Sequence, residues 1–102
     1  MRILVVCGAG ASSTFVAHRL RQAAHAAGLE LEVAASARSA FADRLAGTDT
    51  VLIGPHLPDV DDVRTQSEAA GALAITLPED VFADTDGTRI LALVQPAPRG
   101  TP

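Results

Sequence analysis

Cys7 and the residues that follow it are the part of the sequence best suited to chemistry. The segment CGAGASST places a thiol directly before two glycines and three hydroxyl side chains. The glycines let the backbone turn tightly and point its amides inward, and amides at a helix N-terminus favour an anion. The same field lowers the pKa of a thiol and favours the nucleophilic thiolate. The segment therefore predicts a cysteine that holds a phosphoryl group in a cradle formed by Gly8, Ala9, Gly10, Ala11, Ser12, Ser13 and Thr14.

Four other motifs share parts of this loop, and each lacks a required residue. A dinucleotide-binding G-x-G-x-x-G would need glycine at Ser13 and an acidic residue after the second strand, where Ala35 and Ser36 stand. A nucleotide phosphate loop needs a lysine, and the chain has none; a thioredoxin-like motif needs a second cysteine. The Cys-x5-Arg pattern of cysteine phosphatases and arsenate reductases would place arginine at Ser13. That arginine would help to hydrolyse a thiophosphate, so its absence favours a phosphocysteine that persists and is passed on.

The sequence offers few other candidates for chemistry. His56 lies in the loop after the third expected strand, where it can donate to a phosphoryl oxygen or remain a solvated histidine. His18 and His25 are too far apart on one helix face to share a metal ion. The three aspartates within 59–62 are explained by the preference for acidic residues at a helix start. We therefore expect neither a metal nor a cofactor.

Short aliphatic runs alternate with helical stretches along the chain. Gly28 and Gly71 are suitable helix stops, and Ser12 or Ser13 can cap the first helix. The pattern predicts strands at 3–6, 29–35, 50–53 and 72–77, and helices at 12–27, 37–46, 58–70 and from 84–86 to 94.

This alternation predicts an α/β fold, a small doubly wound sandwich in which helices cover both faces of a four-stranded parallel sheet. Ligands of such sheets bind at the carboxyl ends of the strands, near the point where the strand order switches. The loops 7–14 and 54–58 are both expected at that edge.

Composition limits the partners and the compartment. The chain has 102 residues, of which 48% are hydrophobic, enough for one folded domain. A net charge of -4 argues against nucleic acid or an anionic membrane surface as the main partner. One cysteine excludes an internal disulfide and fits a reducing compartment. The first apolar run is shorter than the ~7–15 residues of a signal peptide, and nothing approaches a membrane helix, so we expect a cytoplasmic protein.

Three stretches of the chain resemble the enzyme IIB component of the bacterial sugar phosphotransferase system, in its lactose, cellobiose and chitobiose branch. They are ILVVCGAGASST, TVLIGPHL and the Asp86-Gly87 step. The resemblance implies the strand order 2-1-3-4 and a single domain over residues 1–95. The Pro-rich terminal segment 96–102 is expected to be a frayed tail. The chain departs from the family pattern at His56, where glutamine is usual after Gly-Pro, and in its Pro-rich tail.

The resemblance also implies a function. Cys7 would accept a phosphoryl group from a phosphohistidine of enzyme IIA and pass it to a sugar bound by the membrane component, enzyme IIC. We expect the chain to act as a monomeric phosphotransferase. The alternatives are a cysteine-dependent phosphatase or reductase-like enzyme and a non-catalytic, anion-binding regulatory module.

Overall fold

Strands and helices alternate along the chain, as the sequence predicts. The computed structural model describes residues 1–8, 10–55, 57–78, 80 and 87–94. In chain order the elements are β1 (Arg2–Cys7), α1 (Gly10–Ala26), β2 (Glu32–Ala37), the 3-10 helix η1 (Arg38–Ala40), α2 (Phe41–Arg44), β3 (Thr50–Ile53), α3 (Val60–Ala69), β4 (Leu73–Thr76) and α4 (Thr88–Val94).

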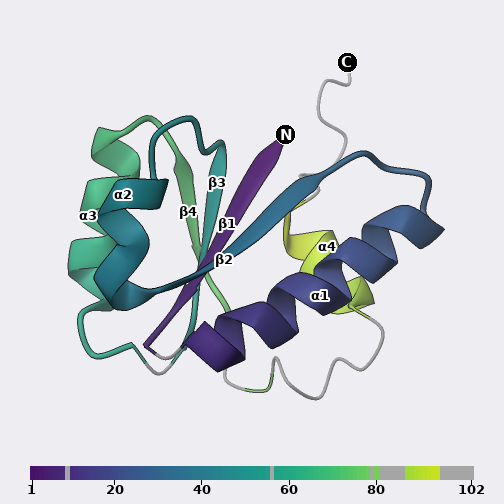
Figure 1. Ribbon diagram of the computed structural model, residues 1–102, viewed down its shortest axis with the longest axis horizontal. Helices are drawn as coiled ribbons and strands as arrows, with labels where there is room; N and C mark the ends of the chain where they lie inside the picture. Colours follow the sequence, from purple (N-terminus) through teal and green to yellow (C-terminus); the bar gives the residue numbers. More distant parts are fainter. Residues whose placement is uncertain (9, 56, 79, 81–86, 95–102) are drawn as a thin grey trace.

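The four strands form one parallel sheet in the order β2-β1-β3-β4. Helices α1 and α4 lie on one face and α2 and α3 on the other (Figure 1). The predicted fold class and strand order are therefore confirmed. Because β2 and β3 flank β1 on opposite sides, the strand order switches direction next to β1.

The two faces of β1 divide its side chains between two cores. Ile3 and Val5 pack with α1 and α4, whereas Leu4 and Val6 pack with α2 and α3. All four side chains are at most 2% exposed. This burial explains why the run 3–6 is continuously aliphatic rather than alternating.

Helix α1 ends in a glycine cap, as predicted. Gly28 has a φ of +73°, the N–H of Gly28 bonds the carbonyl of His25, and the N–H of Leu29 bonds that of Ala24. This cap holds Leu29 in the helix end, so β2 begins at Glu32 and not at the predicted residue 29. Leu29 and Leu31 still pack against the core on the α1 side.

Two further predictions differ from the structure. Helix α1 already begins at Gly10, so Ser12 and Ser13 lie inside its first turns and the predicted serine cap is wrong. The predicted helix 37–46 divides into η1 and α2, and Gly47, with a φ of +79°, follows it. The predicted cap residues 84–86 and the tail 96–102 lie outside the described residues. Among the helices that are described, none has the length and apolar character needed to span a membrane.

Candidate functional site

Cys7 lies at the carboxyl end of the central strand. It is the last residue of β1 and pairs in register with Ala37 of β2. On its other side the N–H of Gly54 donates a 2.8 Å hydrogen bond to the carbonyl of Val6. The carboxyl ends of β1, β2 and β3 therefore lie side by side at the thiol, at the switch in strand order where α/β sheets bind ligands.

Gly54, directly after β3, lies next to the thiol. A Cβ atom at this position would lie 2.7 Å from Cys7 Sγ and 3.3 Å from the carbonyl oxygen of Val6. The φ of Gly54 is not positive, so space and not backbone conformation requires glycine here. The Gly-Pro step that marked this loop in the sequence thus leaves room for the sulfur.

We expect the added methyl group of Gly54→Ala to displace the Cys7 side chain, because the two would overlap. Overpacking of this kind costs about 1–3 kcal/mol in stability. The displaced thiol should react faster with iodoacetamide, and the thermal midpoint should fall. Gly8→Ala is the matched control for stability, because a Cβ at Gly8 meets nothing within 4 Å. Equal melting curves and equal alkylation rates for Gly54→Ala and the unaltered chain would contradict this account.

The Cys7 side chain is shielded from water. It is 5% exposed, and this burial raises the pKa of the thiol above its ordinary value. The prediction of a lowered pKa is therefore wrong in direction. Removal of water from the sulfur disfavours the thiolate and is the cause of the raised pKa. The resting thiol is protonated at neutral pH.

The pKa of Cys7 has a measurable consequence for stability. The folded chain holds the thiol proton more tightly than the unfolded chain does. The free energy of unfolding is therefore undiminished below the pKa of the unfolded thiol, about 8.5, and falls as the pH rises through the folded-state pKa. The chain has no lysine and no tyrosine, whose side chains would also lose protons in the alkaline range.

Denaturant unfolding between neutral and alkaline pH measures this loss. We expect Cys7→Ser to remove this alkaline loss of stability. In the unaltered chain, the ultraviolet absorbance of the thiolate should rise only above the pH at which free cysteine ionises. An ultraviolet midpoint at or below that of free cysteine would show that the helix start, not burial, sets the pKa of Cys7.

Most of the predicted phosphoryl-binding segment follows Cys7 in the chain as Gly8 and the first turns of α1. Gly8 is exposed and has open space where a side chain would lie. Helix α1 then begins at Gly10, so its N-terminus lies close to the thiol along the chain. Ser13 is fully buried and Thr14 is exposed. Ala9 and His56 lie outside the described residues.

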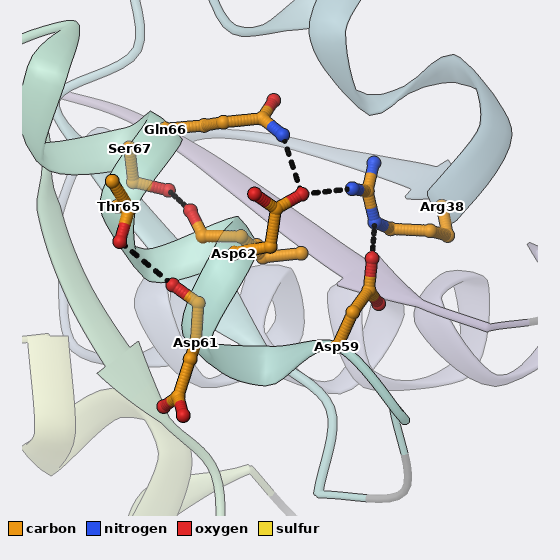
Figure 2. Close-up of polar contacts among 8 residues, drawn as sticks. Arg38, Asp59, Asp61, Asp62, Thr65, Gln66 and Ser67 are labelled. Atoms are coloured by element: carbon orange, nitrogen blue, oxygen red, sulfur yellow. Dashed lines mark hydrogen bonds and ion pairs between the residues drawn. The ribbon is translucent and has the colours of Figure 1, made fainter.

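An ion-pair cluster that the sequence pattern does not predict follows β2. Arg38 follows directly after Ala37, and its Nε lies 2.8 Å from Asp59 Oδ2 while its Nη2 lies 2.9 Å from Asp62 Oδ2 (Figure 2). Gln66 donates a further 2.8 Å hydrogen bond to Asp62. These contacts join η1, directly after β2, to the start of α3.

The sequence signal for this cluster was present but ambiguous. Asp61 and Asp62 do lie in the first turn of α3, as the preference for acidic residues predicts, but Asp59 forms no side-chain cap there. Arg38 is 24 residues from Asp62, so only the fold shows the pairing. Among the described residues, no group of three His, Cys, Asp or Glu side chains is placed to hold a metal ion.

Comparison with known proteins agrees with this geometry. The family model described as "PTS system, Lactose/Cellobiose specific IIB subunit" matches residues 2–92. The lactose-specific IIB component domain from Streptococcus pneumoniae superposes with a TM-score of 0.80 at 16% identity, covering 92% of this chain and 93% of that one. The cellobiose-specific IIB component from Borrelia burgdorferi gives 0.72 at 22% identity, covering 91% and 86%.

The likenesses to the two solved structures concern the fold. No curated protein gives a significant sequence match. The family model, however, spans nearly the whole chain, and its match includes both the Cys7 loop and the Gly-Pro step. The chain therefore belongs to the lactose/cellobiose-specific IIB subunit family of the phosphotransferase system and is a phosphotransferase component that carries phosphoryl groups.

Proposed function

We propose that Cys7 is the residue on which this chain carries the phosphoryl group. It accepts the group from a phosphohistidine of an enzyme IIA and gives it to a sugar held by a membrane enzyme IIC, on the cytoplasmic side. The observation that carries this proposal is the position of the only thiol in the chain. It lies at the end of the central strand, at the switch in strand order and directly before the N-terminal end of a 17-residue helix.

The segment that begins at Gly8 binds the phosphoryl oxygens through the backbone amides that precede α1 and open its first turn. Amides in the first turn of a helix have no partner within the helix, and the helix dipole favours an anion there. The open space at Gly8 lets a ligand approach the backbone closely. The Ser13 hydroxyl is buried, so we assign it no direct contact with the phosphoryl group. His56 follows β3 and can donate to the same oxygens.

Burial of the thiol is compatible with this chemistry because the donor histidine can accept the thiol proton during the transfer. The sulfur attacks phosphorus in line, the P–N bond to the donor histidine breaks, and the thiol proton ends on the departing imidazole nitrogen. In the second transfer a sugar hydroxyl attacks, the S–P bond breaks and the hydroxyl proton returns to the sulfur. Each step exchanges one proton for one phosphoryl group, so Cys7 need not be ionised at rest. Positioning and charge stabilisation supply the catalysis.

The residue at position 13 favours a carrier over a hydrolase. A cysteine phosphatase would use an arginine there to neutralise charge as the S–P bond breaks. Here a serine occupies the position, and its side chain is fully buried. We therefore expect a phosphocysteine that persists until an acceptor arrives.

The test is incubation with a labelled, phosphorylated enzyme IIA of the lactose/cellobiose branch. We expect one acid-labile phosphoryl group on Cys7, located by peptide mass spectrometry, and its release when enzyme IIC and sugar are added. Prior alkylation of Cys7 should prevent the labelling. Label on another residue, or a phosphocysteine that hydrolyses within seconds without acceptor, would overturn the proposal.

A further inference from the structure

Strands β2 and β4 form the two edges of the sheet, and among the described residues no further strand pairs with either of them. Each edge strand presents half of its backbone N–H and C=O groups outward, and such a row is a template for pairing with another strand. Natural proteins often protect an edge with lysine. This chain contains no lysine, and β2, with the sequence EVAASA, carries one charged side chain at its start.

The hydrogen-bond register shows which groups point outward. The N–H of Glu32 bonds the carbonyl of Met1, so Glu32 faces β1 and the next residue, Val33, faces the open edge. In β4, the N–H of Leu73 bonds the carbonyl of Asp49, so Ala74 faces the other open edge.

An arginine covers an outward carbonyl at each edge. Arg21 of α1 donates from Nε and Nη2 to the carbonyl of Val33, at 3.1 and 3.0 Å. Arg64 of α3 donates from Nη1 to the carbonyl of Ala74 at 3.1 Å, and from Nη2 to Thr76 Oγ1 at 2.6 Å. The two helices lie on opposite faces of the sheet, so each edge is covered from a different side (Figure 1).

We propose that Arg21 and Arg64, the edge arginines, keep both sheet edges from pairing with a second copy of this chain. A guanidinium has donors only, so it occupies the outward carbonyl and offers nothing to the N–H of an incoming strand. Its charge and bulk also block the approach of a strand along the edge. The inference concerns surfaces away from Cys7 and stands independently of the phosphoryl chemistry.

The experiment is sedimentation over a wide concentration range for Arg21→Met, Arg64→Met and the double variant. Methionine keeps an apolar stem over the strand while it removes the donors. The control is Arg44→Met, which removes the same charge from an exposed arginine that donates to no strand carbonyl in the described part of the chain. Each single variant should self-associate with a dimer dissociation constant at least about tenfold lower than that of the control, and the double variant should associate more strongly still.

Two results would overturn the proposal. One is a folded double variant that sediments like Arg44→Met at every concentration. The other is an unaltered chain that already dimerises through a sheet edge. If the methionine variants do not fold, nitrogen-15 NMR of the unaltered chain decides. The Nε–H of Arg21 should exchange with water more slowly than that of Arg44, and equal exchange would contradict the contact with Val33.

Discussion

Replacing Cys7 by serine is expected to abolish phosphoryl acceptance, with a loss of more than about a thousandfold in the rate of transfer. A serine hydroxyl is a far weaker acid and nucleophile than a thiol, and burial makes its ionisation harder still. The smaller oxygen fits the space that Gly54 leaves for the sulfur, so the fold should be retained. The measurement is the rate of label uptake from a phosphorylated enzyme IIA, with a melting curve beside it.

Ser36→Ala is the matched control for Cys7→Ser. Ser36 is buried at the end of the neighbouring strand, and its hydroxyl bonds the carbonyl of Ala37, the register partner of Cys7. The control therefore changes one buried polar atom at the same sheet edge without removing the nucleophile, and its transfer rate should stay close to that of the unaltered chain. A folded Cys7→Ser protein that still phosphorylates sugar would show that another residue carries the group.

The sheet could be predicted from the sequence because its strands are short, aliphatic and separated by glycines. The predicted strand 50–53 has the same bounds as β3, and the predicted strand 3–6 lies within β1. The start of β2 could not be predicted in the same way. The side chains of Leu29 and Leu31 pack against the core, as their type predicts. The backbone N–H of Leu29, however, bonds Ala24 in the glycine cap of α1 and does not join the sheet. Local hydrogen bonding in the helix cap, not hydrophobic pattern, sets that boundary.

For the site, the sequence indicated the residues but not their environment. Cys7 was evident because it is the only thiol beside a glycine-rich turn. The direction of its pKa shift was not, because that depends on how completely β2 and β3 cover the strand end. The closeness of Gly54 to the sulfur and the pairing of Arg38 with Asp59 are contacts between loops far apart in the chain. Such contacts exist only once the strand order is known.

The largest loss of stability is expected from Gly87→Ala, at the start of α4. Gly87 is buried, has a φ of +77°, and its carbonyl accepts the hydrogen bond of Leu91 in the first turn of α4. A Cβ here would run into the backbone carbonyl of Arg19 and lie 3.2 Å from Ala23 Cβ. Because the obstacle is the backbone of α1, it cannot rotate aside. The left-handed conformation costs about 1–2 kcal/mol and the overpacking about 1–3 kcal/mol.

Gly28→Ala separates these two costs. Gly28 has nearly the same conformation, with a φ of +73°, but a Cβ there meets nothing within 4 Å. Chemical denaturation should therefore show a loss for Gly87→Ala that exceeds the loss for Gly28→Ala by about 1–3 kcal/mol. The excess measures how closely the start of α4 approaches α1, since the conformational cost cancels in the comparison. Equal losses would mean that α4 can move away from α1 without cost, and glycine at position 87 would then serve the turn alone.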